Sequence, residues 1–234
     1  MGQNDPDAIK AERNENTMHI QDGILGQSLP EIISLSLGGV VALGGTFAGL
    51  RGLDDEKIPR VAVLSSAFFV ASLIHIPLGP ASAHLVLNGL AGLLLGWACF
   101  PALLIGLILQ GVLFGFGGIT TLGLNTTNMA LPGVLCYYLF RGGMGARSRA
   151  RTFAAGFGAG ALAILLAGLM TGGALLAAGR EFDVIARGIL LAHLPVMIIE
   201  GFVTGEAVLF LRKVRPETLQ PLSEESPAPP PMWA

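Results

Sequence analysis

Charged residues are scarce in this sequence of 234 residues, since Asp, Glu, Lys and Arg together make up only 13% of it. An average soluble domain contains about 25%. The 80 consecutive residues from 61 to 140 contain no charged residue at all, whereas about 20 apolar residues suffice for one helix to cross a bilayer. The scarcity excludes an ordinary soluble domain and indicates a membrane protein with several spans.

Other features are missing as well, and each absence excludes a class of protein. A formal net charge of −2 argues against a nucleic-acid-binding surface, which needs basic residues for most of its affinity. Cys99 and Cys136 lie inside apolar segments and form no CxxC pair, so we expect small buried side chains rather than a redox site. The absence of an HExxH motif argues against a membrane metalloprotease.

The apolar stretches predict an all-α fold, a polytopic membrane bundle of about seven transmembrane helices. The seven predicted spans cover residues 32–50, 61–78, 84–99, 101–116, 121–140, 152–179 and 188–211. Glycine is abundant, with 33 residues, and it lets helices approach closely within a membrane. The flanking segments are polar: we expect residues 1–17 to be a disordered leader, 18–215 to form the transmembrane bundle, and the proline-rich 216–234 to be a disordered cytoplasmic tail.

Lysine and arginine predict the orientation, because short cytoplasmic loops are enriched in them. If the N-terminus is outside, the outer loops contain only Arg180 and Arg187 apart from the leader. The inner loops then contain Arg51, Lys57, Arg60, Arg141, Arg147, Arg149, Arg151, Arg212, Lys213 and Arg215. We therefore expect a multi-pass protein of the cell (inner) membrane with a cytoplasmic C-terminus.

Four histidines, His19, His75, His84 and His193, all fall in the outer third of the predicted bundle. An ionisable side chain at membrane depth is costly and is a candidate for function. Neutral imidazole is also a common ligand of divalent transition metals, so four histidines at one depth favour a metal site over separate packing roles.

Two acidic residues of the last span, Glu200 and Glu206, are the obvious alternative ligands. Their positions in that span predict that they lie too deep to meet the outer histidines. We interpret them as polar contacts between helices or as a coupling point for a partner subunit.

The pair Met18-His19 suggests a more specific chemistry. If Met18 is the mature N-terminus, its amine, the amide nitrogen of His19 and the His19 Nδ1 can chelate one ion, and His84 can supply a fourth nitrogen. Tetragonal nitrogen sets suit Ni(II) and Cu(II), and Co(II) is held less rigidly. Because the chelate needs a free amine directly before the histidine, we expect translation to start at Met18 or the leader to be removed.

Four motifs occur in order: MHIQDGIL at 18–25, GPASAHL at 79–85, FGGITTLGLN followed by NMA at 116–130, and HLPVMIIEGFVTG at 193–205. Together they resemble the CbiM/NikM family, the substrate-binding membrane components of energy-coupling-factor (ECF) transporters for cobalt and nickel. The resemblance covers residues 18 to about 217. The sequence departs from the family pattern in its leader and in Gln21, where proline is common.

The resemblance implies a metal site of Met18, His19 and His84. Hydrogen bonds from polar neighbours often orient metal ligands, and the candidates for that role are Ser82, Asn125, Asn128, His75 and His193. For the serine and the two asparagines, the alternative is that they satisfy backbone groups where helices break.

The resemblance also implies a protein that binds metal and is not an enzyme. The chain lacks a GxxxxGK[ST] phosphate loop, so ATP hydrolysis would have to come from partners. The implied partners are an ECF transmembrane scaffold (T) component and a cytoplasmic ABC ATPase, with a small accessory membrane subunit as a further candidate. The transported ion is Co²⁺ or Ni²⁺, with Co²⁺ favoured because the shorter cobalt-type members are more similar.

A different class of function stays open on the residues alone. Two histidines such as His75 and His193 can ligate haem in a membrane subunit of a respiratory complex. That alternative needs a haem-sized cavity, and it leaves the Met18-His19 pair unexplained.

Overall fold

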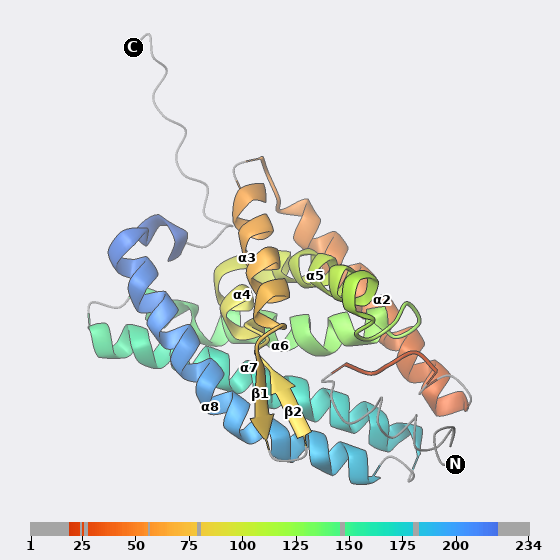
Figure 1. Ribbon diagram of the computed structural model, residues 1–234. Helices are drawn as coiled ribbons and strands as arrows, with labels where there is room; N and C mark the ends of the chain where they lie inside the picture. Colours follow the sequence, from red (N-terminus) through yellow and green to blue (C-terminus); the bar gives the residue numbers. More distant parts are fainter. Residues whose placement is uncertain are drawn as a thin grey trace.

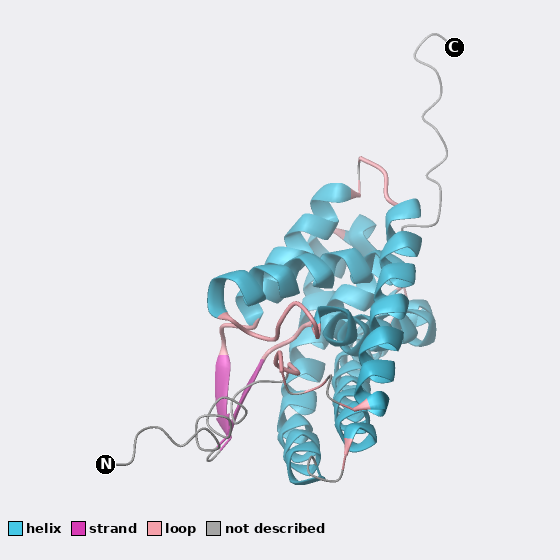
Figure 2. Ribbon diagram, turned by 90° about the vertical axis from the view of Figure 1, so that its right-hand side faces the viewer, coloured by secondary structure: helices cyan, strands magenta, loops and turns pink. Residues whose placement is uncertain are grey.

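The computed structural model describes residues 19–23, 25, 28–55, 57–78, 81–145, 148–179 and 183–219. Helices pack into a bundle, with one two-stranded ribbon at its edge (Figures 1 and 2). The elements are α2 (Leu29–Arg51), α3 (Ile58–Ala71), β1 (His75–Leu78), β2 (Ala81–His84), α4 (Asn88–Leu95), η1 (Gly96–Ala98), α5 (Cys99–Phe114), α6 (Leu122–Met144), α7 (Arg149–Ala178), α8 (Asp183–Val214) and η3 (Pro216–Leu219).

Helix α2 begins at a capping box. The Glu31 carboxylate accepts a hydrogen bond from the Ser28 amide at 3.2 Å, and a proline occupies the first turn, where its missing amide hydrogen costs nothing. Along the helix, Gly38 and Gly45 face the bundle so closely that a Cβ there would lie 2.6 Å from Leu124 and from Phe100. These two glycines therefore let α2 pack tightly against α5 and α6.

The core is shared by the helices that follow α2. Every residue of α4 is buried, and the main apolar cluster joins side chains from α3, α5, α6, α7 and α8. Its members include Phe68, Phe100, Leu103, Met129, Ile164 and Val196. Cys99 and Cys136 are free and fully buried, which confirms the expectation of small core residues.

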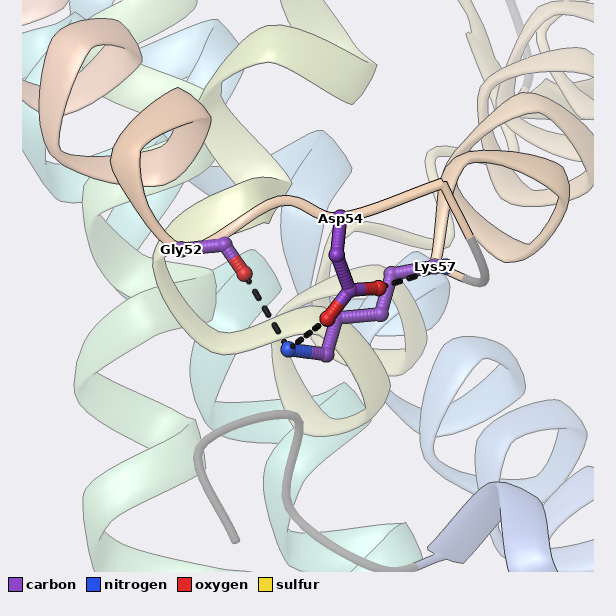
Figure 3. Close-up of polar contacts among 3 residues, drawn as sticks. All are labelled: Gly52, Asp54 and Lys57. Carbon is purple, nitrogen blue, oxygen red and sulfur yellow. Dashed lines mark hydrogen bonds and ion pairs between the residues drawn. The ribbon is translucent and has the colours of Figure 1, made fainter. Parts of the chain in front are cut away.

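The basic residues of three connections meet at one end of the bundle. Figure 3 shows the turn between α2 and α3, where Lys57 Nζ lies 2.7 Å from the Asp54 carboxylate and donates to the Gly52 carbonyl at 3.3 Å. Arg60, one turn into α3, donates to the Thr218 carbonyl of η3 at 3.5 Å. Arg212 at the end of α8 donates to Thr152 at the start of α7 at 2.6 Å.

The segment after α3 differs from the sequence prediction of a continuous span over 61–78. Helix α3 ends at Ala71, and the chain then forms an antiparallel ribbon of β1 and β2 in which His75 is the register partner of His84 (Figure 2). Two prolines and a glycine between residues 77 and 80 explain the change, since proline cannot continue a helix. His84 therefore ends a strand and does not open a helix.

The predicted spans 84–99 and 101–116 correspond to α4, η1 and α5, which follow one another without a loop. Gly96, with φ +56°, lies between α4 and α5, close to the predicted boundary between the two spans. In the described part of the chain, four helical stretches are long and apolar enough to cross a membrane: Leu29–Arg51, Asn88–Phe114, Arg149–Ala177 and Ala186–Val214. The count of seven spans stays a prediction.

Candidate metal centre

Two imidazoles that are 65 positions apart in the sequence face each other inside the bundle. His19 lies in the segment before α2, which we call the N-terminal strap (residues 19–23), and His84 ends β2. Their ring centroids are 5.1 Å apart, with an angle of 29° between the ring planes. Both side chains are buried, at 3% and 1% exposure, so the pair is closed to bulk water.

Asn125 holds the strap in place from the first turn of α6. Its side-chain oxygen accepts from the Ile20 amide at 3.1 Å, and its side-chain nitrogen donates to the Ile20 carbonyl at 2.9 Å. An amide side chain can pair in this way with both backbone groups of one residue. The neighbour of His19 is therefore fixed at both of its polar atoms.

Asp22 fastens the other end of the strap to the glycine loop, which we define as residues 115–121. Its carboxylate accepts from the amides of Ile119 and Thr120, each at 3.0 Å, and from the Thr120 hydroxyl. Burial raises the pKa of the Asp22 carboxyl, but the hydrogen bonds from Thr120 and Ile119 lower it by more, so the net shift is downward. An ionised carboxylate therefore joins the strap to the glycine loop.

Glycines make the approach of the strap possible. A Cβ on Gly118 would lie 1.9 Å from the Asp22 side chain. Gly117 has φ +74°, a conformation that glycine adopts without strain, and a Cβ there would lie 3.2 Å from the Asn125 amide. The FGGITTLGLN motif thus has a physical basis. Its glycines leave room for the strap, and its asparagine and threonine form hydrogen bonds with it.

The ring of His84 is oriented by the backbone of the next residue, Leu85. The Nδ1 of its ring lies 3.0 Å from the Leu85 carbonyl, and because a carbonyl oxygen only accepts, Nδ1 carries the hydrogen. In the uncharged form of the ring the lone pair is then on Nε2, which is buried. A nitrogen of this kind is a suitable metal ligand.

The environment keeps His19 neutral. Burial lowers the pKa of His19 to about 3, the neighbouring His84 lowers it as well, and the polar side chain of Gln110 beside the ring acts in the opposite direction. Gln110 comes from α5 and is fully buried. A neutral imidazole can bind a cation without first losing a proton.

The other predicted site residues lie in different surroundings. Met18 lies outside the described residues, as do the side chains of His75 and Ser82. Asn128 donates to the Thr171 hydroxyl at 3.3 Å. Among the described residues, no group of three or more His, Cys, Asp or Glu side chains is placed to hold a metal ion.

His193 occupies a helix-packing position. Its Nδ1 lies 2.6 Å from the Ile189 carbonyl one turn earlier in α8, and a Cβ on Gly168 of α7 would meet its ring at 2.8 Å. These contacts fit the role of a buried histidine that joins α7 and α8.

Sequence reasoning missed two polar residues of the site. Gln110 has a visible signal, since it is the one amide side chain in the apolar stretch 99–114. We interpreted Glu200 as a polar contact between helices or a coupling point, and its carboxylate accepts hydrogen bonds from the amides of Val86 and Leu87, two and three residues after His84. These partners were not predicted, because they depend on the ribbon, which brings the segment after His84 to the middle of α8.

A helical bundle with apolar spans and a buried pair of facing imidazoles defines the class: a multi-pass membrane protein with a polar centre inside the bundle. Comparison with protein families then identifies the family. Residues 19–218 match the family described as "CbiM: Cobalt uptake substrate-specific transmembrane region". The chain belongs to the CbiM family and is a cobalt/nickel transport membrane protein.

Individual relatives agree with this assignment. A Haemophilus influenzae protein named for metal transport is 39% identical over 204 residues, which cover 86% of this chain and 97% of that protein. The fused nickel transport protein NikMN of Rhodobacter capsulatus is 32% identical, over 91% of this chain and 66% of its own length. The cobalt transport protein CbiM of Sorangium cellulosum is 31% identical, over 73% of this chain and 80% of its own length.

Solved structures share the fold. Two crystal structures, one of a transition metal transporter and one of a truncated form, each match with a TM-score of 0.64 over 84% of this chain. The truncated form is 23% identical to it and the other is 24% identical, and the matches cover 99% and 93% of those chains, respectively. At this identity the likeness establishes the architecture.

Proposed function

We propose that this chain is the substrate-binding component of an ATP-driven ECF-type importer of a divalent transition metal, with Co²⁺ favoured over Ni²⁺. The observation that carries the proposal is the buried, facing pair of His19 and His84 in a chain of the CbiM family. Imidazole suits both ions. The preference for Co²⁺ is supported by the family description, which names cobalt uptake.

The proposed ligands are four nitrogens. His84 supplies Nε2, because its Nδ1 is bonded to Leu85. His19 supplies its ring Nδ1 and its own amide nitrogen, and Met18 supplies the free amine once it is the first residue. The bonds from Asn125 and Asp22 support this arrangement, since they hold the strap that carries His19.

Release of the ion into the cytoplasm requires partners in this proposal. The sequence has no phosphate-binding loop, so a scaffold (T) component in the membrane and a cytoplasmic ABC ATPase would supply the energy, with a small accessory membrane subunit as a further partner. The basic residues at one end of the bundle, such as Lys57, Arg60 and Arg212, support a cytoplasmic location for that end and an external N-terminus. Among the described residues nothing favours the haem alternative, because the His193 ring packs against Gly168.

The proposal is tested by the intact mass and the metal content of the full chain extracted from membranes. We expect a mass that corresponds to a start at Met18 and about one Co²⁺ or Ni²⁺ per chain. His84→Ala, and separately an alanine inserted between Met18 and His19, are expected to abolish metal retention. Lys57→Ala, at the far end of the bundle, is the matched control and is expected to retain metal. Retention by both site variants at the wild-type level would contradict the proposal.

A further inference from the structure

We propose that Glu200 is a positioning residue of the metal site, which fixes His84 by holding the backbone of Val86 and Leu87. The inference rests on the proposed function, since it concerns the same pair of imidazoles. Glu200 comes from the middle of α8, more than 100 positions away in the sequence from the segment that it holds.

The contacts are made by a carboxylate with no exposure to solvent. One oxygen accepts from the amides of Val86 and Leu87, the latter at 3.0 Å, and the other oxygen accepts from Leu87 at 3.1 Å. A buried carboxylate is costly unless donors surround it. Here two successive amides and the start of α4, with its positive dipole end, offset part of this cost.

The segment that Glu200 holds is strained. Leu87 has φ 54° and ψ 19°, and among the described residues it is the one non-glycine residue with positive φ. A residue with a branched side chain rarely adopts this left-handed conformation and does so only where its surroundings impose it. The Glu200 carboxylate is the partner that draws the Leu87 amide into this conformation.

The strain at Leu87 affects the metal site because the same segment orients the His84 ring. The His84 ring is bonded to the Leu85 carbonyl, and the Leu85 amide donates to the Ile74 carbonyl at 3.3 Å. The Leu85 carbonyl and the Val86 amide belong to one peptide unit, so the unit that orients the ring is itself bonded to Glu200. If that anchor is removed, Leu87 can leave the left-handed conformation, and the Leu85 carbonyl turns with the backbone. The His84 Nε2 then loses its fixed direction.

The experiment compares Glu200→Gln with Glu206→Gln in the full chain. Glu206 lies on the same helix but is exposed, so its variant is the matched control. Ni²⁺ affinity is measured by competition with a chromogenic chelator, the visible d–d band of bound Ni²⁺ reports the ligand geometry, and a thermal melt reports folding. We expect Glu200→Gln to fold, to bind Ni²⁺ about 10 to 100-fold more weakly and to shift the band. A Glu200→Gln protein with wild-type affinity and band would overturn the proposal.

A second variant isolates the mechanism. Glycine adopts the left-handed conformation freely, so Leu87→Gly should need the carboxylate less. We expect Glu200→Gln to weaken Ni²⁺ binding by a smaller factor in the Leu87→Gly background than in the wild type, as a double-mutant cycle measures. An equal or larger factor, or a double variant that does not fold when Leu87→Gly does, would refute the proposed role.

Metal binding by the chain and the role of Glu200 are tested by different outcomes. If the wild-type chain, with a free Met18 amine, binds neither Ni²⁺ nor Co²⁺, the proposed function is wrong. If the wild type binds and Glu200→Gln binds equally well, only the role of Glu200 is wrong.

Discussion

At the residue scale, the site consists of two buried imidazoles and the polar side chains that hold them. The His19 and His84 rings lie 5.1 Å apart in a region without solvent contact. Asn125 and Gln110 come from two different helices and meet the same short strap. Asn125 contacts Ile20 and Gln110 contacts His19, and we expect removal of either contact to weaken metal binding.

Asn125→Leu is expected to weaken metal binding by at least tenfold. The substitution keeps the volume but removes both partners of the buried Ile20 backbone, and an unsatisfied buried polar group costs about 1–3 kcal/mol. Metal content after dialysis measures the loss. Thr126→Val is the matched control, because the Thr126 hydroxyl bonds only to its own helix at Leu122. If the Asn125→Leu chain kept its metal as well as the Thr126→Val chain does, the anchoring role would be wrong.

Gln110→Leu is expected to lower metal affinity by about 10 to 100-fold without unfolding the chain, because a polar partner that orients a ligating imidazole contributes this much in other metal sites. The side chain is fully buried beside His19, and leucine has a similar volume. Chelator competition measures the affinity, and Leu109→Ala, exposed on the same helix, serves for comparison. Equal affinities in the two variants would remove Gln110 from the site.

At the element scale, close helix approach depends on a few glycines. A Cβ on Gly92 of α4 would lie 2.2 Å from the Gly133 backbone of α6, so Gly92→Ala must separate two core helices. We expect it to lower the melting temperature in detergent strongly or to prevent folding. Gly44→Ala on α2 has no atom within 4 Å of its Cβ and is expected to be neutral or slightly stabilising. Similar melting of both variants would contradict the packing described.

The strap and the glycine loop form a second pair of elements with a testable junction. Asp22→Asn replaces an acceptor of three hydrogen bonds with a neutral group, and charge-assisted bonds are about twice as strong as neutral ones. We expect faster amide exchange at Ile119 and Thr120, measured by hydrogen–deuterium exchange with mass spectrometry at fixed pH. Unchanged exchange at both amides would show that the carboxylate is not what holds the junction.

Much of this arrangement could be predicted from residue patterns, and the exceptions have physical causes. Apolar stretches locate α2, α6, α7 and α8 within a few residues, because uncharged helices of this length have few alternatives in a membrane. The ribbon from His75 to His84 was not predicted, because its residues are as apolar as a span and only the prolines mark the break. The contact of Glu200 with Leu87 depends on that ribbon, so it could not be predicted either.

At the scale of the whole molecule, the bundle has two different ends. Arg60 and Arg212 lie with the Lys57 turn at one end, whereas the strap and the glycine loop belong to the metal site. The proposed orientation places the basic end in the cytoplasm and lets the ion arrive from outside.

Cysteine labelling tests this orientation. The native Cys99 and Cys136 are fully buried, so an introduced cysteine provides the signal. Ile119→Cys, at a position that is 89% exposed, is expected to react with a membrane-impermeant maleimide in intact cells. Arg215→Cys is expected to react only in inverted vesicles. The reverse pattern would overturn the orientation.

The most direct test of the whole account is X-ray absorption spectroscopy of the full chain loaded with one equivalent of Ni²⁺ or Co²⁺. We predict a first shell of nitrogen atoms with multiple scattering from two imidazoles, one of which disappears in His84→Ala together with most of the bound metal. A shell of oxygen or sulfur atoms, or an imidazole count that is the same in the wild type and in His84→Ala, would contradict the claim that His19 and His84 share one ion.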